Sequence, residues 1–167
     1  RLDLSDADQS AQYALMVEIR RALQETHEAV DRIREVRAQL QDRADRASKE
    51  GYGDELPALA DSVAADLTAI EETLTQTKSE SNQDPLNFPP MLDNQLAYLY
   101  GYVGFSDGAP TEGASQRFSD LRTELDTELG RLEDVLAEGV ARFSDTLSER
   151  DVPAVIVPEA GRSPDSE

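Results

Sequence analysis

The chain contains a single histidine and no cysteine, which leaves His27 as the one imidazole able to bind a metal or move a proton. His27 precedes Glu28 and lies four residues before Asp31, and a helix would place these carboxylates near the imidazole ring. A metal site needs further soft or imidazole ligands, and the sequence has none to offer. We therefore expect no metal or cofactor, and we interpret His27 as a hydrogen-bonded histidine at the edge of an interhelical seam.

Paired carboxylates are the next candidates for chemistry. Acid–base catalysis needs two carboxylates in contrasting environments within one pocket. Here the pairs recur at spacings typical of a solvated helix face, so the sequence predicts a protein that is not an enzyme. These pairs are Glu71 with Glu72, Glu124 with Glu128, and Glu133 with Asp134.

A polar, proline-bearing connection at residues 79–90 interrupts the helical pattern, and tyrosines follow it. Long connections inside compact domains are usually functional or packed by their own side chains. The aromatic residues after it fall on several faces of a helix, so some of them must be exposed, and exposed tyrosine is favoured at interfaces. The alternative is that they pack the connection onto the helices. The candidate ligand or interface residues are His27, Arg37, Asn82, Asp84, Asn87, Phe88, Asn94, Tyr98 and Tyr102.

The charge of the chain limits its partners. Thirty-five acidic residues against 16 basic ones give a net charge of −19, which argues against nucleic acid or an anionic membrane as a partner. Only Lys49 and Lys78 are lysines. Two explanations stay open: adaptation to high salt, or an arginine-rich composition with an ordinary acidic surface. No apolar run is long enough for a membrane span and no signal peptide is present, but we interpret the chain, which begins at Arg1, as a fragment of a larger protein.

The elements that must position these residues are helical. Apolar residues recur by threes and fours over residues 10–48, 54–78, 89–103 and 111–147, with Gly51-Tyr52-Gly53 ending the first run in left-handed conformations. The first stripe contains Arg37, which we expect to pair with an acidic residue on a neighbouring helix. The residues of that stripe are Met16, Ile19, Leu23, Thr26, Val30, Ile33, Arg37 and Leu40.

Apolar stripes joined by short turns predict an all-α fold, an antiparallel up-down four-helix bundle with two long and two shorter helices. We assign residues 1–155 to a single bundle domain and residues 156–167 to a disordered tail. The strip at 152–157 either lies extended against the bundle or is a linker remnant. Because the third helix is short, part of the seam along the first and last helices should stay uncovered.

Several short segments of the sequence resemble the C-terminal region of large bacterial proteins. The main body of those proteins is a β-propeller of BNR/sortilin-like repeats, and they are often labelled glycosyl hydrolase-like. The resemblance covers roughly residues 12–155 and is most specific in and around the polar connection. The resemblance implies an accessory helical domain that follows a propeller in an exported, extracytoplasmic protein, and it brings no catalytic residue onto this chain. The words that carry it are Gln76-Thr77-Lys78, Asn82-Gln83-Asp84-Pro85-Leu86-Asn87-Phe88-Pro89, Leu92-Asp93-Asn94-Gln95-Leu96-Ala97, Glu25-Thr26-His27-Glu28-Ala29-Val30-Asp31-Arg32-Ile33-Arg34 and Asp151-Val152-Pro153-Ala154.

Two functional hypotheses follow. The first is an interaction module that packs on its own propeller, or forms a homodimer, through the uncovered seam. The second is a binding module for a small sugar or peptide, in which residues 79–94 and His27 line a pocket. Alanine at Asn87 and Asn94 would abolish binding without lowering stability if the second hypothesis holds.

Overall fold

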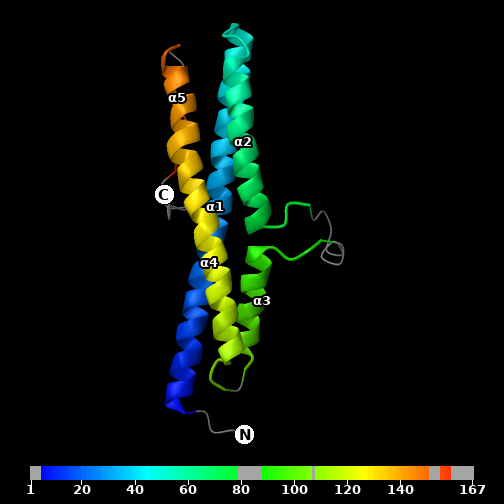
Figure 1. Ribbon diagram of the computed structural model, residues 1–167, viewed down its shortest axis with the longest axis vertical. Helices are drawn as coiled ribbons and strands as arrows, with labels where there is room; N and C mark the ends of the chain where they lie inside the picture. Colours follow the sequence, from blue (N-terminus) through cyan, green and yellow to red (C-terminus); the bar gives the residue numbers. More distant parts are fainter. Residues whose placement is uncertain (1–4, 79–87, 107, 151–154, 159–167) are drawn as a thin grey trace, which may run out of the picture. The chain divides into compact units, whose positions relative to one another are not determined.

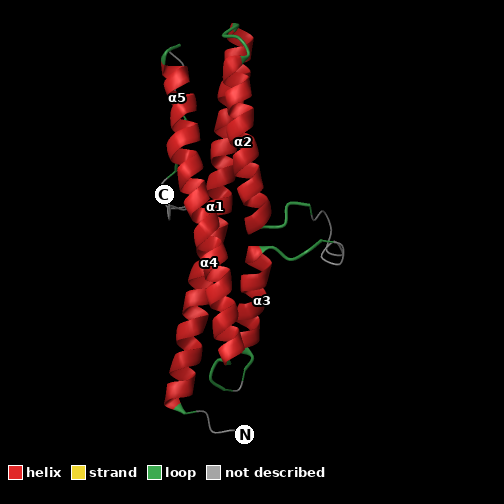
Figure 2. Cartoon of the chain, in the orientation of Figure 1, coloured by secondary structure: helices red, strands yellow, loops and turns green. Residues whose placement is uncertain are grey.

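The computed structural model describes residues 5–78, 88–106, 108–150 and 155–158. Helices account for nearly all of this part of the chain, and no strand occurs in it (Figures 1 and 2), so the all-α prediction is confirmed. The helices are α1 (Asp6–Glu50), α2 (Glu55–Leu74), α3 (Leu92–Gly104) and α4 (Glu112–Asp134), and the last continues through the π-helical η2 (Val135–Val140) into α5 (Ala141–Ser148). The antiparallel arrangement stays a prediction.

The chain divides into two compact units. Unit 1 comprises residues 1–27 and 73–127, and unit 2 comprises residues 28–72 and 128–167. The two units share helices, because α1 and α4 contribute residues to both and α2 contributes its end, Thr73 and Leu74, to unit 1.

The core of unit 1 is made of aliphatic side chains at helical spacing. In α3 the buried positions follow one another by fours and threes, which places them on a single face. The buried apolar residues of this unit are Ile19, Ala22, Leu74, Leu92, Leu96, Leu99, Val103, Ala114, Leu121 and Leu125.

Unit 2 has a second aliphatic core and one large aromatic ring. Its buried apolar residues include Val30, Ile33, Val36, Leu40, Leu56, Val63, Leu67, Ile70, Leu132, Leu136, Val140, Phe143 and Leu147. The strip after α5 joins this core, since Val155 is buried and the Gln39 amide hydrogen-bonds the backbone of Ile156 at 2.9 Å and 2.8 Å. For the described residues of this strip, which begin at Val155, the structure shows the alternative in which they lie against the helices.

Local chemistry sets the ends of the helices. Gly51 and Gly53 have φ angles of 79° and 83°, as predicted, and the amides of Gly51 and Tyr52 bond the carbonyls of Ser48 and Ala47 in a Schellman motif. At the other end, α1 begins at Asp6 rather than at residue 10, because the hydroxyl of Ser5 caps the amide of Asp8 at 3.1 Å.

Two further boundaries differ from the expected ones. The second helix ends at Leu74 instead of residue 78, and the third begins at Leu92 instead of at the Pro89-Pro90 pair. The expected cap of the last helix is confirmed, since the Thr111 hydroxyl accepts a hydrogen bond from the Ala114 amide at 3.1 Å.

Candidate functional site

Helix α3 differs from the rest of the chain in its surface. Charged residues make up 31% of the whole sequence, but only Asp93 is charged among the 13 residues of α3. Tyr98, Tyr102 and Phe105 are 76%, 51% and 92% exposed and stand one helical turn apart. We call these three residues the aromatic face.

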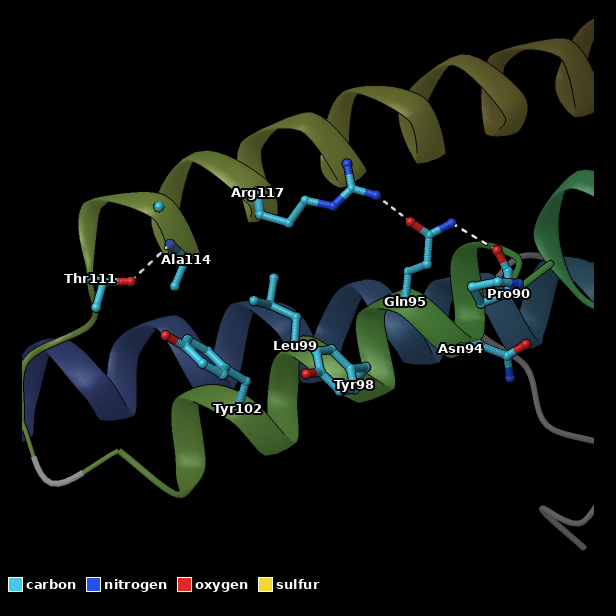
Figure 3. Close-up of a pocket in the computed structure, with 10 residues that line it drawn as sticks. Pro90, Asn94, Gln95, Tyr98, Leu99, Tyr102, Thr111, Ala114 and Arg117 are labelled. Atoms are coloured by element: carbon cyan, nitrogen blue, oxygen red, sulfur yellow. Dashed lines mark hydrogen bonds between the residues drawn. The ribbon is translucent and has the colours of Figure 1, made fainter. Parts of the chain in front are cut away.

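A groove of about 600 Å³ lies beside this face, between α3 and α4 within unit 1 (Figure 3). Tyr98 and Tyr102 form one wall, and Leu99 lies between the two helices. The α4 wall is low because Gly113 and Ala114 have small side chains. The lining residues are Pro90, Asn94, Gln95, Tyr98, Leu99, Tyr102, Thr111, Gly113, Ala114 and Arg117, and none of these described residues is acidic.

A second hollow of about 540 Å³ lies along the same stretch of α3 and shares the two tyrosines with the groove. Tyr98 and Tyr102 therefore form a ridge with an open space on both sides. The residues of the second hollow are Ala97, Tyr98, Gly101, Tyr102, Phe105 and Ser106.

The aromatic face points outward because the opposite side of α3 is buried. Leu92, Leu96, Leu99 and Val103 are buried, so a residue that falls between them in the helical pattern must point outward. The C-terminal end of α3 is tied to α1 by Gln12, whose Nε2 donates to the carbonyls of Val103 at 2.7 Å and Ser106 at 2.8 Å.

A polar bridge spans one end of the groove. The Arg117 guanidinium of α4 donates to Oε1 of Gln95 on α3, and Nε2 of Gln95 donates to the carbonyl of Pro90 at 2.9 Å (Figure 3). Before α3, Thr75 Oγ1 donates to Asp93 Oδ2 at 2.6 Å and Gln76 Nε2 to the Pro89 carbonyl at 3.1 Å. These bonds hold the entry to α3 in place at one end of the groove.

A second arginine of α4, Arg122, forms ion pairs within unit 1. Burial lowers its pKa, but hydrogen bonds to Asp126 and Glu25 and the charges of these two carboxylates outweigh that effect and leave the pKa raised. The bond from Nη1 to Glu25 Oε2 measures 2.5 Å and ties α4 to α1 within unit 1. Arg122 is thus a fixed cation in an ion pair.

The structure brings three of the predicted site residues together and leaves others apart. Asn94, Tyr98 and Tyr102 all line the groove. Phe88 is half-buried. Asn82, Asp84 and Asn87 lie outside the described residues.

His27 is more exposed than expected for a histidine at the edge of an interhelical seam. Its side chain is exposed, because the preceding Thr26 takes the buried position and donates its hydroxyl hydrogen bond to the Ala22 carbonyl at 2.8 Å. One residue further along a helix turns a side chain by roughly 100°, which carries His27 away from the seam. His27 does not line the groove either.

Arg37 pairs as predicted, in unit 2. Its Nη1 lies 2.7 Å from Oε2 of Glu71 and 3.0 Å from the hydroxyl of Thr68. Arg34 binds the other carboxylate oxygen of Glu71 at 2.6 Å. The arrangement connects α1 to α2 and satisfies a carboxylate that is only 3% exposed, so Arg37 has a structural role.

The sequence pattern missed the α4 side of the groove, above all Arg117 and Thr111. It also predicted the open apolar seam along the first and last helices, whereas this groove lies between the third and the last. The signal that could have located it is the absence of charge from the exposed positions of residues 94–105 in so acidic a chain.

Two features are absent from the described residues. Within these ranges no three His, Cys, Asp or Glu side chains gather as a metal site would require. No helix in the described part of the chain is both long and apolar enough to cross a membrane. Comparison with protein families, with characterised proteins and with solved structures finds no match to this chain.

Proposed function

We propose that this chain is a non-catalytic protein-interaction domain that binds its partner through the aromatic face of α3 and the adjoining groove. The observation that carries the proposal is the row of Tyr98, Tyr102 and Phe105, exposed along α3 and at its C-cap, on a helix with a single charge. Tyrosine enrichment and depletion of charge distinguish the centres of protein interfaces from ordinary surface.

The energetics support this assignment. An exposed aromatic cluster is costly to keep in water, since each ring offers a large apolar area, and monomeric proteins seldom carry such patches without a use. Leu92, Leu96, Leu99 and Val103 already fill the buried face of α3, so the exposed rings do not belong to the core of unit 1. Their exposure supports a role in binding.

The resemblance of the sequence suggests which protein this partner belongs to. We propose that the chain is the accessory domain of an exported bacterial propeller protein and that the surface contacts its own propeller, with a second copy of the chain as the alternative. A small-ligand site is the second candidate function, since the groove volume of about 600 Å³ falls within the range of small-molecule pockets.

Display of random peptides against the chain tests the proposal. The library is selected on the wild type and counter-selected on the double variant Tyr98→Ala with Tyr102→Ala. We expect a population of binders that the double variant loses and that Tyr13→Ala keeps, because Tyr13 is equally exposed at 71% but does not line the groove. If every binder is retained by the double variant, the aromatic face is not an interaction surface.

A further inference from the structure

We infer that the groove between α3 and α4 takes a short, extended, proline-containing segment of its partner, with basic residues at the ends of that segment. This inference rests on the proposed function and names the ligand class of the same site. Its argument comes from the size of the face, the hydrogen-bonding groups that line the groove, and the charge around it.

The size of the face favours contact with an extended segment of the partner over a broad contact between two folded surfaces. Helix α3 has 13 residues and is therefore roughly 20 Å long. A stable interface between folded proteins needs about 800 Å² and 20–30 residues from each partner, which is more than one face of so short a helix provides. A polyproline segment rises about 3.1 Å per residue, so six or seven residues would match the length of α3.

The groove offers several hydrogen-bond donors. Asn94 contributes an exposed amide, the tyrosines contribute hydroxyls, and Arg117 contributes a guanidinium. Two of the acceptors there are already engaged within unit 1, since Gln95 Oε1 accepts from Arg117 and Thr111 Oγ1 accepts from the Ala114 amide. A ligand rich in carbonyls but poor in N–H groups suits such a lining, and proline supplies a carbonyl without an N–H.

The ridge of Tyr98 and Tyr102 supplies the apolar contacts. The two tyrosines stand four residues apart, which corresponds to a rise of about 6 Å along the helix axis. This rise is close to the spacing of every second residue in a polyproline helix. Grooves lined by aromatic rings are the usual docking sites of such segments, because the preformed helix loses little entropy on binding.

Charge complementarity decides the ends of the ligand. The chain carries a net charge of −19, so an acidic ligand or a second copy would be repelled and a basic one attracted. Glu112 is exposed and lies in sequence between two groove residues, Thr111 and Gly113. The groove itself has no carboxylate among its described lining residues, and its one charged side chain there is Arg117, so the basic residues of the ligand belong outside the groove.

Fluorescence anisotropy with defined peptides tests the inference. The probe is labelled Arg-Pro-Pro-Ala-Pro-Pro-Arg, and the matched peptides replace all prolines by alanine or both arginines by glutamate. We expect the probe to bind the wild-type chain and Tyr13→Ala equally, and both matched peptides to bind at least about tenfold more weakly. Tyr98→Ala should lower the affinity of the chain for the probe by a similar factor, and added salt should lower that affinity as well.

Equal binding of the alanine peptide and the probe would overturn the proline ligand, and so would binding of the probe that Tyr98→Ala leaves unchanged. Peptide display separates the two proposals: binders that need the aromatic face but lack proline and basic residues refute the ligand class alone. A complete absence of such binders refutes the interaction function too. A dimer in sedimentation equilibrium that Tyr98→Ala dissociates would assign the face to a second copy instead.

Discussion

Glu71 of α2 is bound on both carboxylate oxygens, with Arg37 at 2.7 Å and Arg34 at 2.6 Å, and it is the most deeply buried acidic group in the described part of unit 2. The two arginines belong to one turn of α1, so a single carboxylate holds two helices in register. Removing one partner of such a group costs more than an exposed ion pair is worth, because the remaining charge stays partly desolvated.

The first prediction concerns this triad. Arg37→Ala should lower the free energy of unfolding by about 1–3 kcal/mol, because it deprives Glu71 of its more buried partner and Thr68 of a donor. Arg46→Ala is the matched control, since Arg46 makes an exposed pair with Asp42 on the same helix, worth about 0–0.5 kcal/mol. Urea denaturation of both variants measures the difference, and an equal loss would mean that Glu71 gains nothing from Arg37.

A pair of helical glycines gives the second prediction. A Cβ at Gly139 would lie 3.1 Å from Cγ2 of the buried Val63, closer than ordinary carbon–carbon contact, whereas a Cβ at Gly130 would meet nothing within 4 Å. Gly130→Ala should therefore stabilise unit 2 by about 0.5–1 kcal/mol, and Gly139→Ala should lose that gain to crowding.

Thermal unfolding of the two variants, with Gly139→Ala also made in a Val63→Ala background, checks the cause. The crowding explanation requires the alanine at 139 to be better tolerated once the valine methyls are gone. If Gly139→Ala stabilises as much as Gly130→Ala in the wild type, the close approach does not exist in solution.

The strip after α5 provides the third prediction. Gln39 makes two hydrogen bonds to the backbone of Ile156, so Gln39→Ala should release this segment and speed amide exchange at Ile156. Each bond is worth about 0.5–1.5 kcal/mol, which corresponds to a several-fold or larger increase in exchange. Gln41→Ala serves as control because Gln41 bonds only the nearby side chain of Asp45. Unchanged exchange in Gln39→Ala would contradict a docked strip.

The fourth prediction concerns salt. With a net charge of −19, repulsion between carboxylates should outweigh the screening of the exposed ion pairs, so the melting temperature should rise when ionic strength increases from about 0.05 M to about 1 M. Sodium chloride is the appropriate salt, since sulfate would add a separate stabilising effect. A falling melting temperature would show that the ion pairs contribute more than the repulsion.

Periodicity predicted most of the fold. Stripes of leucine, valine and isoleucine determined the four helical segments, and the glycines at 51 and 53 adopt the left-handed conformations that their position requires. Helix ends were less accurate because they depend on single hydrogen bonds, such as the cap from Ser5 to Asp8, that periodicity does not register. The division of α1 and α4 between two compact units was also missed, since both helices are continuous in sequence pattern.

The site was only partly predictable. Tyr98, Tyr102 and Asn94 follow from residue type and helix phase, but Arg117 and Thr111 come from a different helix and become neighbours only through packing within unit 1. His27 illustrates the opposite case. Its chemistry attracted attention, but helix phase sets its exposure, and the phase is fixed by Thr26 at the buried position.

The low charge of α3 has a consequence for handling the protein. At neutral pH we expect the dense carboxylates elsewhere on the chain to repel identical molecules, so that the exposed rings of Tyr98, Tyr102 and Phe105 do not cause aggregation. Below about pH 4.5, where carboxylates take up protons, the repulsion between molecules weakens. The exposed rings then become the part of the surface most prone to self-association. Association through α3 should therefore make the solution turbid under mild acid. Replacing these rings by serine should move the onset of turbidity to a lower pH.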